Sequence, residues 1–233
     1  MTEAAAELRQ FETRSQASQQ LATDIAEMLQ AGIDRRGRAS LVVSGGSSPL
    51  PTLNALADLE LNWGRVSVTL SDERWVALGD PLSNEAMVRR ELLRGPAAGA
   101  ELVGLFVPDR SAAEAVDTAH QRISAMARPF DAVLLGMGAD GHTASLFPGS
   151  PELDLALSSQ RLCEAVAVPQ IDQKRMTLTP AALLDTEFLA LLFFGEDKLD
   201  VYQQALQPGD VQQFPVRSML HQDRVPPMTY YAP

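Results

Sequence analysis

The stretch "FDAVLLGMGADGHTASLFPG", residues 130–149, joins a short apolar run to a glycine-rich loop. The run is typical of a buried strand, and the loop that starts at Gly136 has the Gly-x-Gly-x-x-Gly spacing of a dinucleotide-binding turn. Such a turn requires a full helix after its glycines. Pro148 and Pro151 leave room for only a turn or two of helix. The loop is therefore predicted to present His142 at the end of a strand, and not to hold a dinucleotide.

Apolar runs alternate with amphipathic segments on both sides of this loop. This pattern indicates an α/β fold, with a largely parallel sheet that is covered by helices on both faces. We expect a single domain over residues 1–233, with its ligand at the carboxyl ends of the strands. Further strands are predicted at 39–46, 65–73, 101–107, 161–168, 175–179 and 187–195, with a final edge strand at 228–232. Helices are predicted at 3–32 (ending near Gly32), 49–59, 84–93, 111–127 and 196–207.

The composition limits the partners and the compartment. The 233-residue chain has a formal net charge of −11 and one cysteine, Cys163. The negative charge argues against nucleic acid or an anionic membrane as a partner, but a local cluster of amides and cations would still bind a small anion. The N-terminal "MTEAAAELRQ" lacks the apolar core of a signal peptide, and "FLALLFF" at 188–194 is too short to cross a bilayer. We therefore expect a cytoplasmic protein, which a lone cysteine fits.

The sequence "SGGSSP" at 44–49 lies between a predicted strand and a predicted helix. Gly45 and Gly46 can adopt positive φ and expose their amides, while Ser47 and Ser48 add hydroxyl donors. The following helix N-terminus adds partial positive charge, so the loop is predicted to bind a phosphate. It lacks the Gly-Lys-Ser/Thr ending of a nucleotide P-loop. A tight turn without a ligand is the alternative.

Charged residues gather in "SDERW" at 71–75, where another predicted strand ends. The fork of the Arg74 guanidinium suits a phosphate, and a neighbouring carboxylate, Asp72 or Glu73, would hold it in place. An ordinary surface ion pair is the alternative.

Two more cations are candidates for the same anion. Arg175 begins a predicted strand, and Lys198 lies in the first turn of the helix predicted at 196–207. A lysine in a first helical turn opposes the helix dipole, which a nearby anion would make tolerable. Plain solvation of both side chains is the alternative.

Asp140 and His142 bracket the last glycine of the opening loop. Histidine exchanges a proton near neutral pH, so His142 is predicted to act as a general base. A structural histidine that bonds the loop backbone is the alternative. His120 and His221 are expected at the surface.

The chain lacks the spacings of other catalytic chemistries. Its three histidines are far apart in sequence, and no His-x-His, HExxH or CxxC pattern is present, so we expect no metal site. Cys163 lies in an apolar run and is expected in the core. No Gly-x-Ser-x-Gly pattern is present, which argues against a serine esterase.

The chain resembles the 6-phosphogluconolactonase family from about Leu41 to Lys198. The segments that carry the resemblance are "SGGSSP", "SDERWV…SNEAMVRRELL", "GMGADGHTASLFPG", "KRMTLTP" and "GEDK", in that order. The related glucosamine-6-phosphate deaminases have an apolar residue and an Asn-Glu-Pro-Gly turn after the Gly-His pair, where this chain has "TASLFP" at 143–148. Two departures are Ser48, where the family usually has threonine, and the stretch "ALGDPL" after Trp75.

The resemblance implies a Rossmann-like fold shared with glucosamine-6-phosphate deaminase and ribose-5-phosphate isomerase. It also implies hydrolysis of 6-phospho-D-glucono-1,5-lactone in the oxidative pentose phosphate pathway, without a cofactor. On this hypothesis His142 activates a water molecule and Asp140 orients the imidazole or supports its charged form. The substrate and its phosphate are bound by the remaining candidates, Gly45, Gly46, Ser47, Ser48, Asp72, Arg74, Arg175 and Lys198.

Two other functions are open at this point. An isomerase or deaminase acting on a sugar phosphate needs a carboxylate base near C2, and Asp72 is well placed for that role. A sugar-phosphate sensor would carry a DNA-binding helix-turn-helix ahead of its effector domain, whereas here one predicted helix precedes the first predicted strand. We expect a monomer or a weak homo-oligomer.

Overall fold

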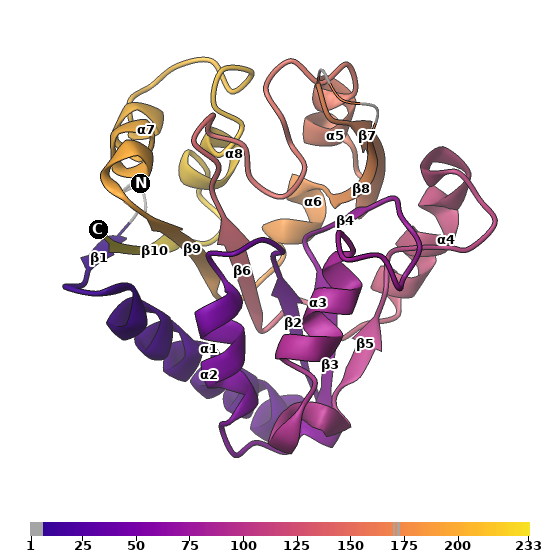
Figure 1. Cartoon of the computed structure of the whole chain (residues 1–233), viewed down its shortest axis with the longest axis vertical. Coiled ribbons are helices and arrows are strands. Elements are labelled where there is room, and N and C mark those ends of the chain that lie inside the picture. The colour runs from indigo at the N-terminus through magenta and orange to yellow at the C-terminus, as the bar shows by residue number, and fades with distance from the viewer. Residues whose placement is uncertain (1–6, 170, 172) are drawn as a thin grey trace.

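The computed structural model describes residues 7–169, 171 and 173–233 (Figure 1). Its larger sheet has seven strands in the order β1-β10-β9-β6-β2-β3-β5, and the neighbouring strands are parallel. This confirms the predicted α/β fold with a largely parallel sheet. The strands are β1 Glu7–Gln10, β2 Ala39–Val43, β3 Val66–Leu70, β5 Glu101–Val103, β6 Ala132–Gly136, β9 Leu189–Phe194 and β10 Pro227–Ala232.

A second, three-stranded sheet is antiparallel and has the order β4-β8-β7. Its strands are β4 Asp72–Arg74, β7 Cys163–Ala167 and β8 Lys174–Leu178. The single strand predicted at 65–73 is therefore wrong. It divides at Ser71 into β3, which belongs to the larger sheet, and β4, which belongs to the smaller one.

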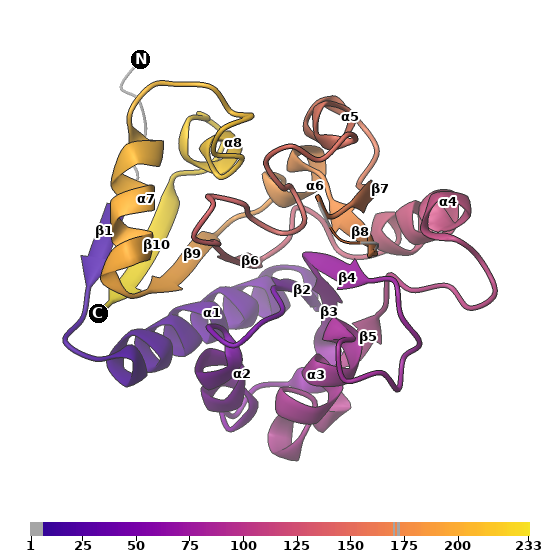
Figure 2. The same ribbon diagram turned by 45° about the horizontal axis from the view of Figure 1, so that its top comes forward.

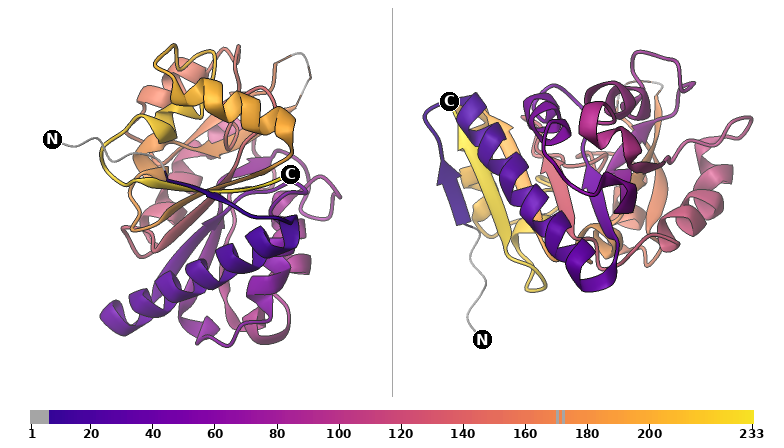
Figure 3. Two further views of the ribbon diagram at one scale, coloured as in Figure 1. Left: turned by 90° about the vertical axis from the view of Figure 1, so that its left-hand side faces the viewer. Right: turned by 90° about the horizontal axis from the view of Figure 1, so that it is seen from below.

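Helices cover both faces of the larger sheet. In the left view of Figure 3, α1 lies on one side of β1 and β10, and α7 lies on the other side. Figure 2 shows α2 and α3 on the α1 side, and α8 beside α7. The helices are α1 Arg14–Arg36, α2 Leu50–Ala57, α3 Asn84–Glu91, α4 Ala112–Ser124, α5 Leu153–Ser158, α6 Pro180–Leu183, α7 Glu196–Leu206 and α8 Arg217–Leu220, with 3₁₀ turns at Trp63–Arg65 and Gly95–Gly99.

The helix predicted at 3–32 is wrong at both ends. It begins only at Arg14, because Thr13 closes a capping box: its hydroxyl accepts from the amide of Gln16, whose side chain accepts from the Thr13 amide. The helix continues past Gly32 and stops at Gly37, which adopts φ 71°. The first residues of the prediction, 3–6, lie outside the described residues.

The residues before this helix form β1, which pairs with β10. The strand predicted at 228–232 as an edge strand is therefore inside the sheet, between β1 and β9. Arg9 of β1 and Tyr230 of β10 both donate hydrogen bonds to Asp24 of α1. The Asp24 carboxylate therefore links the edge strand β1 and its neighbour β10 to α1.

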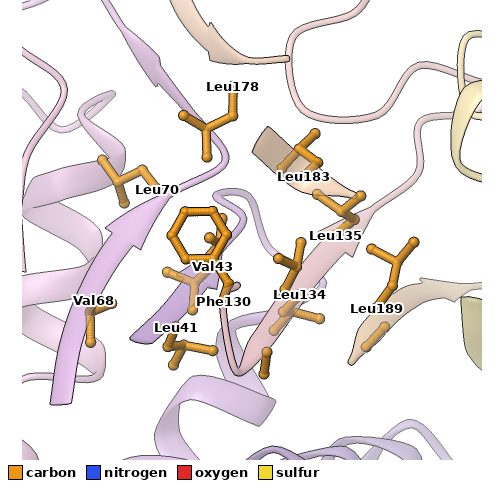
Figure 4. Packing of buried hydrophobic residues seen from close by; sticks show 14 of the residues in the cluster. Leu41, Val43, Val68, Leu70, Phe130, Leu134, Leu135, Leu178, Leu183 and Leu189 are labelled. Carbon is orange, nitrogen blue, oxygen red and sulfur yellow. The ribbon is translucent and has the colours of Figure 1, made fainter. Parts of the chain in front are cut away.

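One hydrophobic cluster connects the two sheets. Leu70 at the end of β3 and Leu135 of β6 belong to the same cluster as Leu178 of β8 and Leu183 of α6, and each is buried (Figure 4). The smaller sheet is thus packed onto the larger one near the carboxyl ends of its central strands. Among the described residues, no helix has the length and apolar character needed to cross a membrane.

Candidate functional site

The predicted loops meet at one cavity of about 230 Å³ above the carboxyl ends of β2, β3, β6 and β9. All but one of the predicted site residues line it; the exception, Asp140, lies directly behind His142 and hydrogen-bonds it. The lining residues are Ser44, Gly45, Gly46, Ser47, Ser48, Pro49, Asp72, Arg74, Asn84, Gly136, Met137, Gly138, His142, Ala144, Arg175 and Lys198. The cavity therefore connects the histidine loop with the glycine–serine loop and with three cations.

The glycine–serine loop lines the cavity with backbone that requires glycine. Gly46 has φ 90°, a value that favours glycine, and a Cβ on Gly45 would lie 2.0 Å from Oδ1 of Asn84. The amides of residues 45–48 donate no hydrogen bond within the described part of the chain. The amides are therefore without an internal acceptor there, and the phosphate-binding role expected of this loop stays a prediction.

Ser44 anchors the loop to the strand that carries the histidine loop. Its hydroxyl donates to the carbonyl of Leu134 at 3.0 Å and accepts from the amide of Gly136 at 3.2 Å. Ser44 therefore fixes the glycine–serine loop beside the histidine loop, at the carboxyl ends of β2 and β6. Ser44 itself was not among the predicted site residues.

Of the three charged residues in "SDERW", Glu73 is structural. It is fully buried, and its carboxylate accepts from the amides of Asn84 and Glu85, both at 2.7 Å, at the N-terminus of α3. Burial raises the pKa of the Glu73 carboxyl, and the backbone hydrogen bonds oppose this shift. The side chain caps a helix and does not line the cavity.

Arg74 and Arg175 face each other across the antiparallel strands β4 and β8. Arg74 donates to the carbonyl of Leu82 at 2.7 Å, and Arg175 donates to Oδ2 of Asp72 at 3.2 Å. In both residues Nε is buried and lacks a hydrogen-bond partner in the described structure. Burial lowers the pKa of the Arg175 guanidinium, and the charge of Arg74 acts in the same direction.

Asp72 is a buried residue with four neighbouring donors. Oδ2 accepts from Ser145 Oγ at 2.6 Å and from Arg175, while Oδ1 has Ser71 Oγ at 3.2 Å and Asn84 Nδ2 at 3.5 Å. Asp72 therefore lines the cavity with a carboxylate that Ser145 and Arg175 hold in place through Oδ2.

His142 is oriented by Asp140. Its Nδ1 lies 2.5 Å from Oδ1 of Asp140, which also accepts from the His142 amide at 3.1 Å. Burial acts to raise the pKa of the Asp140 carboxyl, but its hydrogen bonds and charge interaction with His142 outweigh burial and lower it. An ionised carboxylate only accepts hydrogen bonds, so Nδ1 carries the proton and the lone pair is on Nε2. The tautomer is the one that a general base needs.

Close packing surrounds this pair. A Cβ on Gly138 would lie 2.2 Å from Nδ1 of His142, so a larger residue there would displace the imidazole. The Phe147 ring packs against the imidazole, with ring centroids 4.3 Å apart, and the Arg175 guanidinium lies 5.6 Å from the centroid of the same ring. One phenyl ring thus contacts both the predicted base and a predicted cation.

Lys198 completes the cavity from the first turn of α7. Burial lowers the pKa of its ammonium group, and the negative charge of Asp140 opposes the shift. A half-buried ammonium group beside the cavity fits the predicted role near an anion.

Several lining residues were not predicted. Asn84 is the first residue of the helix predicted at 84–93 and of α3, whose N-cap is Ser83, and it was not predicted to line the cavity. Ala144 has φ 50°, an uncommon conformation for a residue with a Cβ, and the sequence offers no signal for it. Gly136 and Gly138 are part of the Gly-x-Gly-x-x-Gly spacing, and this spacing is the signal in the sequence that marks them.

Other chemical groups lie away from the cavity. His120 accepts a hydrogen bond from the Leu162 amide and His221 contacts the Ala205 carbonyl, so both have local structural partners. Cys163 is buried, and burial raises the pKa of its thiol to about 12, as expected of a core residue. Among the described residues, no group of three or more metal-ligating side chains is present.

A parallel sheet with glycine-built loops and clustered cations at its carboxyl edge defines an α/β protein of the kind that binds small phosphorylated ligands. A sequence profile of the family described as glucosamine-6-phosphate isomerases/6-phosphogluconolactonase matches residues 12–226, and the chain belongs to this family.

Individual relatives agree with the resemblance found in the sequence. The 6-phosphogluconolactonase of Pseudomonas aeruginosa is 43% identical over 202 residues, which cover 86% of this chain and 85% of the relative. That of Rhizobium meliloti is 39% identical, with coverage of 96% and 97%. A crystal structure of a 6-phosphogluconolactonase from Shewanella baltica superimposes with a TM-score of 0.96 at 42% identity, covering 98% of each chain.

Proposed function

We propose that this protein hydrolyses 6-phospho-D-glucono-1,5-lactone to 6-phosphogluconate, in the cytoplasm and as part of the oxidative pentose phosphate pathway. The main support is one cavity that joins an Asp140-oriented His142 to a loop of free amides and to three cations. The names of relatives that cover nearly the whole chain support the same activity.

The substrate phosphate binds at the end of the cavity formed by the amides of residues 45–48. Arg74, Arg175 and Lys198 supply positive charge around it. This places the phosphate where the local charge opposes the chain's overall charge of −11. The lactone carbonyl then extends towards His142 at the other end.

The reaction begins when Nε2 of His142 takes a proton from a water molecule. The water oxygen forms a bond to C1, and the carbonyl oxygen becomes an oxyanion that loop amides stabilise. The oxyanion then collapses, the bond between C1 and the ring oxygen breaks, and the ring oxygen takes the proton from Nε2. Asp140 stabilises the imidazolium that exists between the two proton transfers.

A proton-release assay on freshly prepared lactone tests the proposal, with the uncatalysed hydrolysis subtracted. The wild-type protein is expected to accelerate the release, and His142→Ala to lower kcat by about 10²–10⁴. A His120→Ala variant is a matched control, because His120 lies outside the cavity. Equal activity of folded His142→Ala and wild-type protein would place the base elsewhere.

The contacts of Asp72 argue against the isomerase or deaminase alternative. That chemistry needs a carboxylate that takes a proton from the substrate, and Oδ2 of Asp72 already accepts hydrogen bonds from Ser145 and Arg175. Incubation with glucosamine 6-phosphate is expected to release no ammonia above background.

A further inference from the structure

We infer that Ser145 is a positioning residue, whose hydroxyl holds the Asp72 carboxylate against Arg175 and so fixes the cation that faces the substrate phosphate. The inference deepens the proposed function and rests on it. It also assigns Asp72 the role of an internal counter-ion for Arg175, in place of direct contact with the substrate.

The Ser145–Asp72 contact is buried. Ser145 is fully buried and Asp72 is 5% exposed, and the distance between Ser145 Oγ and Asp72 Oδ2 is 2.6 Å. Arg175 donates to the same oxygen at 3.2 Å. A hydroxyl that donates to a carboxylate in a buried site forms a strong hydrogen bond, so the shared oxygen is held in one place.

Ser145 is itself fixed to the smaller sheet. Its amide donates to Thr177 Oγ1 at 3.1 Å, and Thr177 lies opposite Asp72 in the pairing of β4 with β8. Two hydrogen bonds therefore join one residue to both strands. Arg175 is two residues before Thr177 on β8, so its backbone is part of the same unit.

Ser145 also belongs to the loop that carries the predicted base. It follows His142 by three residues, and between them Ala144 adopts φ 50°. One loop therefore places the His142 imidazole at the cavity and the Ser145 hydroxyl against Asp72, the counter-ion of Arg175. The separation between the base and this cation depends on the Ser145 contact.

The test compares Ser145→Ala with wild-type protein on phosphorylated lactone and on unphosphorylated gluconolactone. We expect KM for the phosphorylated lactone to rise about tenfold, with kcat changed less than about twofold, because one charge-assisted hydrogen bond is lost. KM for the unphosphorylated lactone should rise less, because that substrate carries no phosphate for Arg175 to bind. The matched control is Ser159→Ala, which removes a 2.6 Å hydrogen bond to Glu164 outside the cavity.

A double-mutant cycle with Arg175→Ala separates positioning from general structure. If Ser145 acts through Arg175, the Ser145→Ala change adds no further rise in KM once Arg175 is absent. The inference is overturned if the two substitutions raise KM additively. It is also overturned if Ser145→Ala impairs both lactones equally, or if its KM equals that of Ser159→Ala.

Binding of 6-phosphogluconate, measured by titration calorimetry, keeps the inference separate from the proposed reaction. Ser145→Ala should bind this probe about tenfold more weakly than wild-type protein. If wild-type protein binds the probe but hydrolyses no lactone, the proposed reaction fails and the binding comparison still decides the role of Ser145. If Ser145→Ala does not fold, Asp72→Asn replaces it, and unchanged binding by that variant would contradict the inference.

Discussion

Arg74 and Arg175 lie directly opposite each other on β4 and β8, so two like charges form a cross-strand pair at the wall of the cavity. Like charges at such positions destabilise a sheet. Asp72 offsets the charge of Arg175, while Arg74 has the Leu82 carbonyl as its acceptor. A bound phosphate would relieve the repulsion, so the pair favours the liganded state.

Arg74→Gln is predicted to weaken binding of the phosphate and not to weaken the fold. KM for the phosphorylated lactone should rise about 10- to 100-fold, because a charge-assisted contact to the substrate is lost. KM for unphosphorylated gluconolactone should stay the same, and the Tm of the ligand-free protein should be unchanged or higher. Steady-state kinetics on both lactones check this, and an equal rise for both would remove Arg74 from the phosphate site.

Asp140→Asn is predicted to lower kcat by about 10²–10⁴, a fall close to that of His142→Ala, because an amide can donate to Nδ1 and favour the wrong imidazole tautomer. KM should change little. Asp154→Asn serves as a control, since that carboxylate contacts Gln212 outside the cavity. Full activity of Asp140→Asn would mean that the 2.5 Å contact does not set the tautomer.

Gly138→Ala is predicted to displace the imidazole without unfolding the protein. The new Cβ would lie 2.2 Å from Nδ1 of His142 and 2.6 Å from Oδ1 of Asp140, so the pair must move. We expect kcat to fall by about 10² or more, since an error of about 1 Å in position is costly. Gly79→Ala is the matched control, because nothing lies within 4 Å of its Cβ. Retained activity of Gly138→Ala would show that the loop adjusts.

Glu73→Gln tests the buried helix cap through its pH dependence. Because burial raises the pKa of the Glu73 carboxyl in the folded state, this group favours folding most at pH values below its unfolded pKa of about 4.3. That contribution is lost as the pH rises through the raised folded pKa. The free energy of unfolding of wild-type protein, relative to that of Glu73→Gln, should therefore fall as the pH rises from about 4 through the raised folded pKa.

Urea unfolding of both proteins at several pH values measures the difference. At low pH we expect Glu73→Gln to be less stable by about 1–3 kcal/mol, because its amide group faces backbone donors at the start of α3. A stability difference that grows with pH would contradict the assigned direction of the pKa shift.

The parallel sheet was predictable because two of its central strands are apolar runs, in "FDAVLLG" and "EFLALLFFG", and the other predicted strands alternate with amphipathic helices. The cavity was predictable for a related reason, since ligands bind where such strands end. One cavity is therefore lined by His142, Arg175 and the glycine–serine loop, as expected, although they are distant in sequence. The prediction of a single domain over residues 1–233 stays a prediction.

Local sequence does not reveal pairing between distant segments. The helical spacing of residues 3–32 continues through Glu7–Gln10, and only the tertiary contact with β10 makes them a strand. The role of Asp72 was also out of reach, because Ser145 and Arg175 are 73 and 103 residues away from it. In both cases the deciding partner lies on another element.

The division of the cavity between two sheets has a consequence for substrate length. The cations Arg74 and Arg175 belong to the smaller sheet, whereas His142 follows a strand of the larger one. Their separation depends on the apolar contact that Leu178 and Leu183 help to form, together with the hydrogen bond from Ser145 to Asp72. A truncation such as Leu178→Ala removes part of this contact, so we expect it to alter selectivity for the length of a phosphorylated lactone, although Leu178 lies outside the cavity.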